Sequence, residues 1–372
     1  MILPPMFRSR FCSMSAVLAA VLQVSGCRGP DADSGTLDST TGSQESSDES
    51  SSSSMSTDDG TDGSSSTSED AACSEPQPAS QSSVVLSTPT GTIAGTWFSP
   101  EGCPPFPTVV FHVGSGPTDR DGNSAVLQGR NDGHLQLAEH LQQAGWASLR
   151  FDKRGIAASA GAVEDWSTVV LQRYVDDLRA WVELLRTDAA LVGPITLLGH
   201  SEGSLISTLA AKEIEVEALL LVAAPGRPFG DVLRTQLQQN LDDPELLAQA
   251  LEILDELEAG NLVRDVPPSL SSLFAPQSQP FLVSLLARDP AGELAGVSGP
   301  VRIIAGTADV QTPVSEAEVL AAAKADAELR IIENMTHVFK DAGQGQDAAY
   351  NDPEVPLADG LVEAVIEFLP RE

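Results

Sequence analysis

The sequence predicts a three-layer α/β fold in which helices cover both faces of a mostly parallel β-sheet. Short apolar runs, typical of strands buried on both faces, alternate with amphipathic helical segments from residue 84 onward. Alternation of strand and helix builds such a sheet around one core. The alternation stops between residues 225 and 300, where a long helical insertion is expected before the sheet resumes.

The expected sheet begins with an antiparallel hairpin. Residues 84–86 and 92–98 are rich in apolar residues, and a turn-like Pro-Thr-Gly at 89–91 separates them. Further continuous apolar runs follow, and each is expected to form a strand buried in the sheet. These runs are 108–111, 147–151, 195–198, 218–222, 301–304 and 329–332.

The helices expected between the strands show apolar residues at a spacing of three or four. Residues 134–144 and 168–185 have this pattern, for example at Leu171 and Val175. The same spacing recurs in the insertion at 225–300. We expect the insertion to form a lid or a wall over a site at the strand ends. The alternative is a helical decoration packed elsewhere on the domain.

Residues 1–26 have the features of an export signal. Arg8 and Arg10 supply positive charge, and residues 14–22 form an apolar core that is shorter than the roughly 20 residues needed to span a bilayer. The sequence Val-Ser-Gly-Cys at 24–27 resembles a bacterial lipobox, which implies lipidation of Cys27. We therefore expect an exported protein, anchored to a bacterial membrane on its periplasmic or cell-surface side. An ordinary signal peptide with a chance cysteine is the alternative.

Residues 27–83 are expected to form a disordered tether, because Ser, Thr, Asp, Glu and Gly dominate and large apolar residues are almost absent. The folded domain is then expected over 84–372. Cys73 and Cys103 are the two cysteines left after the signal and Cys27. An even pair in an oxidising compartment predicts a disulfide that joins the end of the tether to the domain.

The chain is strongly acidic, with a formal net charge of -32 over 372 residues. This charge argues against a nucleic-acid partner, because binding to phosphate backbones needs clustered Lys and Arg. A solvated acidic surface is the simpler interpretation. No H-E-x-x-H or paired C-x-x-C spacing occurs, so we expect neither a metal nor an organic cofactor. The composition leaves the oligomeric state open.

Gly-His-Ser-Glu-Gly at 199–203 is a G-x-S-x-G motif between an expected strand and an expected helix. In that context the serine lies on a strained turn that exposes its hydroxyl above the sheet, and the glycines avoid collisions with the neighbouring strand and helix. Ser201 is therefore the candidate nucleophile. A purely structural turn is the alternative.

A serine hydroxyl needs a base that takes its proton, and histidine is the usual one. Of the five histidines, His337 lies in the loop after the last expected strand, where the chain order of this motif places the base. His134 and His140 are expected at the surface of a helix. The ring of His200 is expected to point away from the reaction.

The acid that orients the base should fall between serine and histidine in the chain. Asp309 follows the strand expected at 301–304 and can accept the second N–H of the imidazole. Its alternative role is a helix cap or an Asx-turn before the helix expected from Val314. Asp289 is the nearest rival, but it lies in the insertion and follows no strand.

Ester or amide hydrolysis also needs N–H donors for the developing oxyanion. We expect one from the backbone of Glu202 and one from Ser115, in the glycine-containing loop 112–117. A Gly-Pro turn without a catalytic donor is the alternative for that loop. The carboxylate of Glu202 would repel an anion, so it is expected to turn away, towards a cation.

Four segments together resemble bacterial α/β-hydrolases of the esterase and acyl-hydrolase group. They are 114–123, 149–155, 199–203 and 334–337. The resemblance covers the chain from about residue 84 to its end. It implies the α/β-hydrolase fold, hydrolysis of a small-molecule ester or acyl substrate through an acyl-enzyme, and the catalytic roles assigned above to Ser201, His337 and Asp309.

The chain departs from the family pattern at two places. In the oxyanion loop Val113 separates His112 from Gly114, and after the G-x-S-x-G turn, the nucleophile elbow, Ser204 replaces a glycine. Asp152 and Arg154 are expected to form a structural ion pair or loop hydrogen bonds beside the site. Two alternatives to an esterase stay open: a serine peptidase using the same triad, and a catalytically silent binding module of the same fold.

Overall fold

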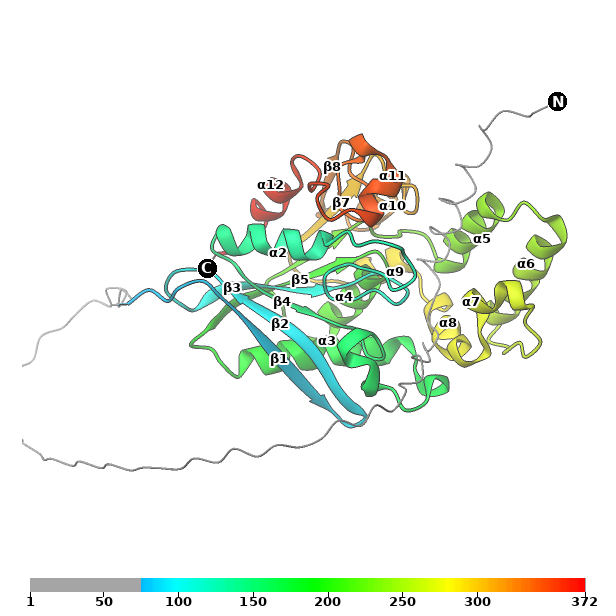
Figure 1. Cartoon of the computed structure of the whole chain (residues 1–372), viewed down its shortest axis with the longest axis horizontal. Helices are drawn as coiled ribbons and strands as arrows, with labels where there is room; N and C mark the ends of the chain where they lie inside the picture. The colour runs from blue at the N-terminus through cyan, green and yellow to red at the C-terminus, as the bar shows by residue number, and fades with distance from the viewer. Residues whose placement is uncertain (1–74, 372) are drawn as a thin grey trace, which may run out of the picture. The chain divides into compact units, whose positions relative to one another are not determined.

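The computed structural model describes residues 75–371, which contain one mixed β-sheet covered by helices (Figure 1). The sheet has eight strands in the order β1-β2-β4-β3-β5-β6-β7-β8. The strands are β1 Ser80–Thr88, β2 Gly91–Ser99, β3 Phe106–His112, β4 Ala147–Phe151, β5 Val192–His200, β6 Ala218–Val222, β7 Val301–Gly306 and β8 Glu328–Ile332. The predicted α/β class and mostly parallel sheet are confirmed.

The first two strands form the predicted antiparallel hairpin, which closes with Thr88 opposite Gly91. Strand β1 begins at Ser80, inside the segment expected to be tether, and Ser80 pairs with Ser99. Its polar residues form strand because β2 offers a matching row of backbone groups, a long-range cause that local composition does not reveal. The boundary expected at residue 83 is therefore wrong.

The expected signal at 1–26, the lipidation site Cys27 and Cys73 lie outside the described residues, as does the tether up to residue 74. Cys103 is disulfide-bonded. Its pairing with Cys73 stays a prediction.

From β4 to β8 all neighbouring strands are parallel, so their carboxyl ends meet at one edge of the sheet. Strands β4, β6 and β7 are buried along their whole length, as their continuous apolar sequences predict. Strand β8 lies at the edge and is largely exposed. Because β5, β7 and β8 end at the shared edge, the loops that follow them can converge above it.

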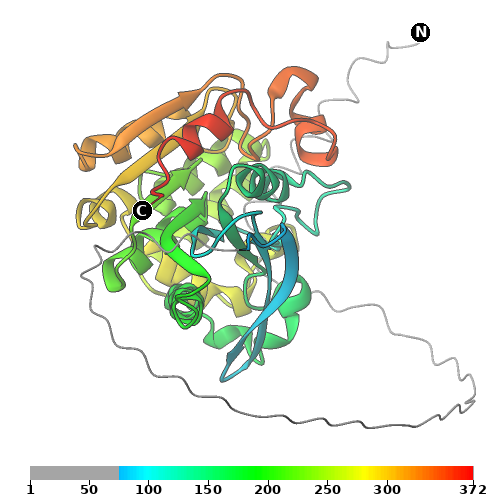
Figure 2. The ribbon, with the colours of Figure 1, turned by 90° about the vertical axis from the view of Figure 1, so that its left-hand side faces the viewer.

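Helices pack on both faces of this sheet (Figure 2). Helices α2 Gly133–Gln143 and α12 Leu361–Ile366 contribute to one apolar cluster. Helices α3 Leu171–Arg186, α4 Glu202–Glu213 and α10 Val314–Ala323 contribute to the other. The helices expected at 134–144 and 168–185 are α2 and α3. No helix within residues 75–371 combines the length and the apolar character needed to cross a bilayer.

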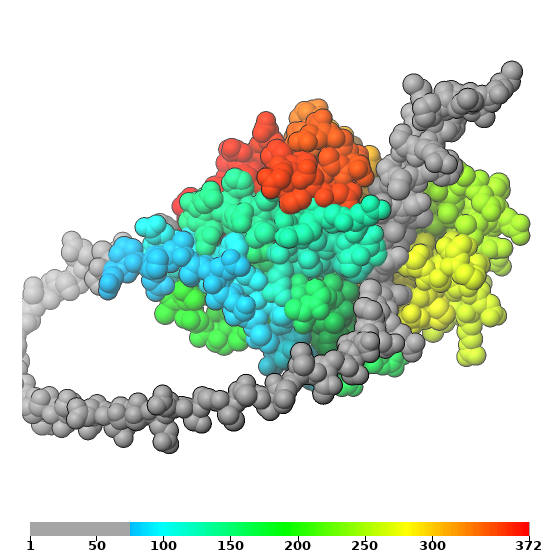
Figure 3. Space-filling view, viewed as in Figure 1, coloured from blue at the N-terminus to red at the C-terminus, as the bar shows by residue number. Residues whose placement is uncertain are grey.

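The insertion between β6 and β7 is helical, as predicted, and forms the yellow-green to yellow part of the surface in Figure 3. Its helices are α5 Phe229–Asn240, α6 Pro244–Glu258, α7 Ser271–Phe274, α8 Gln279–Leu286 and α9 Pro290–Ala295. Asp243 caps α6, with Pro244 in its first turn. Leu254, Leu257 and Phe274 are fully buried and join the larger apolar cluster of the domain.

Candidate active site

Ser201 lies on a sharp turn between β5 and α4, with φ 53° and ψ -123°, a conformation that L-residues rarely adopt. The turn is stabilised by a hydrogen bond from the Ser201 backbone N–H to the Val222 carbonyl at 3.0 Å. A Cβ at Gly199 would lie 2.5 Å from the Gly203 oxygen, and one at Gly203 would lie 2.4 Å from the His112 oxygen. Both glycines are therefore required by close backbone contact, as the motif predicts.

His337 and Asp309 come together above the sheet edge from the loops after β8 and β7. The distance between His337 Nδ1 and Asp309 Oδ2 is 2.8 Å, and the Asp309 side chain is fully buried. Because the carboxylate accepts the Nδ1–H, the lone pair of the neutral ring is on Nε2.

The Asp309 carboxylate is fixed by three further donors. Its Oδ1 accepts the backbone N–H groups of Gln311 and Thr312, at 2.8 and 2.9 Å, as in an Asx-turn. Its Oδ2 accepts the Thr312 hydroxyl at 2.8 Å. Asp309 thus forms an Asx-turn and contacts His337 at the same time, and it does not cap α10, whose N-cap is Pro313. Thr312 was not identified from the sequence.

The Ser201 hydroxyl makes no hydrogen bond to His337 within the described part of the chain. Ser201 lines one cavity and His337 lines a second, and Ser115 and Gln311 line both. The loop before Ser115 runs directly over the nucleophile, since a Cβ at Gly114 would lie 3.2 Å from Ser201 Cβ. Such hydrogen bonds are often long or absent before substrate binds.

Two buried histidines support the loop of His337. His200 Nε2 donates to the His337 carbonyl oxygen at 2.9 Å, which leaves its Nδ1 to accept from His134 Nε2 at 3.2 Å. The expectation that His134 lies at the surface is wrong: it is 2 % exposed and packs against His200 and Phe339. Burial lowers the pKa of His134 to about 3 and also lowers the pKa of His200, so both rings are neutral. His140 is exposed, as expected.

The backbone N–H groups of Ser115 and Glu202 have no acceptor among residues 75–371, and both residues line the larger cavity beside Ser201. The Glu202 carboxylate turns to a cation, as expected, with Oε1 3.7 Å from Lys153 Nζ. Burial raises the pKa of Glu202 and lowers that of Lys153. Lys153 also donates to the Gly114 oxygen at 2.5 Å, a contact that the sequence did not reveal.

Asp152 and Arg154 both form ion pairs, each with a different partner. Asp152 binds the Arg120 guanidinium through both carboxylate oxygens, at 3.0 and 2.7 Å. Arg154 binds Asp177 in the same two-point manner, at 2.7 and 2.5 Å. Neither residue lines the two cavities, so the structural interpretation of this pair holds.

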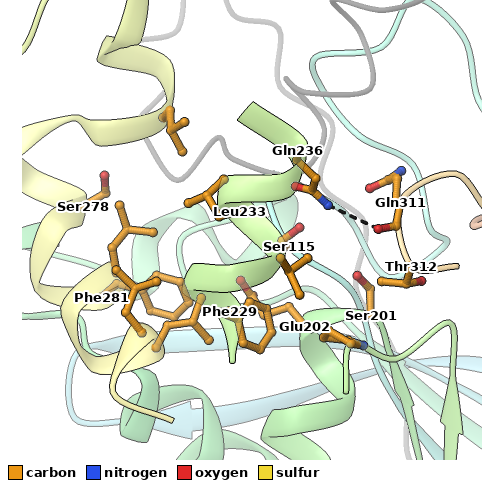
Figure 4. Close-up of a pocket in the computed structure, with 16 residues that line it drawn as sticks. Ser115, Ser201, Glu202, Phe229, Leu233, Gln236, Ser278, Phe281, Gln311 and Thr312 are labelled. Atoms are coloured by element: carbon orange, nitrogen blue, oxygen red, sulfur yellow. Dashed lines mark hydrogen bonds between the residues drawn. The ribbon is translucent and has the colours of Figure 1, made fainter. Parts of the chain in front are cut away.

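The larger cavity has a volume of about 700 Å³ and opens beside Ser201 (Figure 4). Its floor is Ser115, Ser201, Glu202, Gln311 and Thr312. Its wall comes from the insertion and is mostly apolar. The wall residues are Pro225, Phe229, Val232, Leu233, Gln236, Leu273, Ser278, Phe281, Leu282, Leu285 and Leu286. The insertion is therefore a pocket wall, one of the two roles that the sequence predicted for it.

One hydrogen bond links this wall to the acid loop: Gln236 Nε2 of α5 donates to the Gln311 oxygen at 3.4 Å (Figure 4). A second cavity, of about 370 Å³, lies on the other side of Ser115 and Gln311 and reaches His337. Its lining includes hydroxyl and amide groups from Thr118, Asn131 and Tyr350. Glu202 is the one carboxylate residue that lines either cavity.

No group of three or more His, Cys, Asp and Glu residues within 75–371 is arranged to hold a metal ion. The rival acid Asp289 is exposed at the start of α9 and lines neither cavity. The geometry can thus support nucleophilic attack by Ser201, proton transfer through an oriented imidazole, and stabilisation of an oxyanion by two backbone donors.

Comparison with known proteins shows that the chain is similar to α/β hydrolases. Residues 132–258 match a family model described as serine aminopeptidase, S33. Esterase EstD of Thermotoga maritima is 28% identical over 222 residues, which are 59% of this chain and 50% of the relative. The chain thus spans about half the length of this curated relative.

Solved structures show the same fold at low sequence identity. The α/β hydrolase GrgF of Penicillium sp. sh18 aligns with a TM-score of 0.51 at 20% identity, over 78% of this chain and 98% of that one. The hypothetical protein PA2218 of Pseudomonas aeruginosa aligns with a TM-score of 0.52 at 15% identity, over 78% and 94% of the two chains. These likenesses establish the fold.

Proposed function

We propose that this chain, which has the α/β-hydrolase fold, is a serine esterase that cleaves small-molecule carboxyl esters through an acyl-enzyme. The observation that carries the proposal is the floor of the larger cavity: a half-buried serine on a strained turn lies beside two backbone N–H groups that have no acceptor among residues 75–371. Similarity to the Thermotoga esterase supports the same activity.

In the proposed mechanism, Ser201 Oγ attacks the ester carbonyl carbon while its proton passes to His337 Nε2. Asp309 stabilises the resulting imidazolium through the 2.8 Å contact at Nδ1. The N–H groups of Ser115 and Glu202 stabilise the oxyanion. Collapse of this intermediate expels the alcohol, which takes the proton from His337. Water then attacks the acyl-enzyme, with His337 first accepting its proton and then returning it to Ser201.

The shape of the site favours an ester with an apolar portion in the larger cavity. Phe229, Phe281 and Leu285 present apolar surface there, and each buried methylene contributes about 0.8 kcal/mol to binding. The smaller cavity, which reaches His337, suits the alcohol, because the leaving oxygen must receive its proton from that ring.

Aminopeptidase activity, which the description of the matching family model suggests, is the second candidate. Binding a free peptide N-terminus requires a carboxylate that faces the substrate ammonium. Glu202 is the one candidate in the two cavities, and its side chain is buried and paired with Lys153. This pairing favours the esterase.

A substrate panel tests the choice. We expect turnover of p-nitrophenyl esters with short to medium acyl chains and no turnover of aminoacyl p-nitroanilides by the same preparation. Turnover of nitroanilides alone would replace the esterase by a peptidase. A protein that hydrolyses neither, and is inert to fluorophosphonates, would instead be a silent binding module.

We also propose that Cys27 carries a lipid that anchors the exported enzyme to a membrane. The proposal rests on the lipobox-like sequence at 24–27 and the preceding apolar core. Wild type is expected in the membrane fraction of a bacterial host, whereas Cys27→Ser should not be. Cys27→Ser could also remain in the membrane because its signal peptide is not cleaved. Such an unprocessed protein would be recognised by a mass larger than that of the processed form. Equal, processed protein in the membrane for both forms would contradict the anchor.

A further inference from the structure

We infer that Lys153 is a positioning residue for the oxyanion donors: its ammonium group fixes the orientation of the peptide that carries the Ser115 N–H and restrains the residue that carries the other donor. The inference rests on the proposed function, since it assigns a role within the same site. It is based on the contacts of Lys153, which lies just after β4 and is 3 % exposed.

The first contact is with the peptide group between Gly114 and Ser115. Lys153 Nζ lies 2.5 Å from the Gly114 oxygen. In a trans peptide the C=O and the N–H point in opposite directions, so a carbonyl held toward the lysine directs the Ser115 N–H away from it. Ser115 lines both cavities, and its N–H has no acceptor among the described residues. A charged donor to the carbonyl also polarises the peptide, which strengthens its N–H as a donor.

The second contact is with Glu202, which supplies the other backbone donor. The carboxylate of Glu202 lies 3.7 Å from Lys153 Nζ, and both side chains are at most 5 % exposed. This pair keeps the carboxylate away from the position where the oxyanion develops, and it compensates a buried charge that would otherwise be costly. One ammonium group therefore contacts the peptide that carries the Ser115 N–H and the side chain of Glu202, the residue that supplies the other proposed donor.

Without Lys153 the peptide between Gly114 and Ser115 would lose its hydrogen bond on the carbonyl side. Glycine at 114 permits many backbone conformations, so the peptide could rotate and withdraw the Ser115 N–H. The loss would weaken binding of the tetrahedral intermediate more than binding of the planar substrate. A role confined to folding would not discriminate between the two.

The test compares Lys153→Met with Lys324→Met as a matched control. Lys324 is also a buried lysine, 7 % exposed. It donates to the backbone carbonyl of Val297 and pairs with Asp326, and it lines neither cavity. Circular dichroism and thermal unfolding establish that each variant is folded. If Lys153→Met does not fold, Lys153→Met/Glu202→Gln removes the unpaired carboxylate and takes its place.

The readouts are kcat and KM for a p-nitrophenyl ester, and Ki for a trifluoromethyl ketone that adds to Ser201 as an oxyanion. For Lys153→Met we expect kcat to fall and Ki to rise by roughly 30- to 300-fold, with KM changed by less than about threefold, in line with loss of an oxyanion donor. Lys153→Arg, which keeps a cationic donor, is expected to lose less. For Lys324→Met both values should stay within about threefold of wild type.

The inference is overturned if wild type is active and the Lys153 variants match Lys324→Met, or if KM alone changes. Failure of the proposed function gives a different result, because wild type would then be inert to esters and to fluorophosphonates, and both proposals would fall together.

Discussion

The floor and the wall of the larger cavity are built in different ways. The floor, formed by loops after β3, β5 and β7, is fixed by short polar contacts such as those of the Asp309 carboxylate. The wall, formed by the insertion, presents apolar side chains and, among the residues that the structure describes, is linked to the acid loop by one weak hydrogen bond, 3.4 Å long, from Gln236. Polar contacts fix atoms to within a fraction of an ångström, whereas apolar packing tolerates changes of shape.

This difference separates chemistry from selectivity. A change in the floor should abolish the reaction for every ester, and a change in the wall should alter which ester is preferred. The following predictions test that separation, beginning with the largest effect.

Ser201→Ala should reduce kcat for p-nitrophenyl esters by about 10⁶-fold, because the nucleophile is lost and residual catalysis comes from binding and the oxyanion donors alone. Steady-state kinetics on a preparation free of host esterases measures the loss. Alanine also tolerates the φ of 53° no better and no worse than serine, so the melting temperature should change little. Activity above a hundredth of wild type would contradict the assignment.

Asp309→Asn should lower kcat by about 10⁴-fold, since an amide cannot stabilise the imidazolium and favours the wrong tautomer of His337. Asp289→Asn is the matched control, because that aspartate is exposed at the start of α9 and lines neither cavity. Equal losses in the two variants, or none in Asp309→Asn, would mean that another group orients the base.

Acid should destabilise the floor before the wall. His112 and His134 are buried with pKa values lowered to about 3, and burial lowers the pKa of His200 as well. Their folded pKa lies below the unfolded value of about 6.5, so their stabilising effect is complete above that pH and is lost as pH falls below it.

At pH 5.5 His112 and His134 should each reduce the free energy of unfolding by about 1 kcal/mol relative to neutral pH, and His200 should reduce it further. The insertion contains no histidine. Urea titration at pH 7.5 and 5.5 measures the total, and hydrogen exchange should show increased opening around α2 and the elbow first. Constant stability between these pH values would contradict the neutral, buried histidines.

Phe229→Ala should change chain-length preference by about tenfold, because removal of one apolar group from a pocket is worth roughly 1–3 kcal/mol. Phe229 is half-buried on the wall and has no polar group that could take part in the reaction, so kcat for the acetate ester should stay near the wild-type value. The ratio of kcat/KM for octanoate and acetate esters measures the shift. A uniform loss for both esters would mean that the wall also positions the floor.

The strands and the G-x-S-x-G elbow could be predicted from sequence because their signals are local. Continuous apolar runs mark buried strands wherever they pair, and the glycines at 199 and 203 are required by contacts within the turn and its immediate neighbours. Chain order then points to residues after β7 and β8 for the acid and the base. The structure brings Asp309 and His337 within 2.8 Å of each other.

The supporting residues could not be predicted because their partners come from distant segments. Lys153 reaches Gly114 from the loop after β4, and His134 reaches His200 from α2. His134 lies on a helix whose sequence is amphipathic. The spacing of apolar residues does not show that the His134 imidazole faces another buried ring. The polar start of β1 was missed for the same reason, since its pairing with β2 decides its structure.

The central claim is that Ser201 is the nucleophile activated by His337, and mass spectrometry after fluorophosphonate treatment tests it most directly. In wild type, one phosphonyl adduct should form on the peptide that contains Ser201, and a folded His337→Ala variant should show at least a hundredfold slower labelling. An adduct on another residue, or equally fast labelling without the imidazole, would contradict the account.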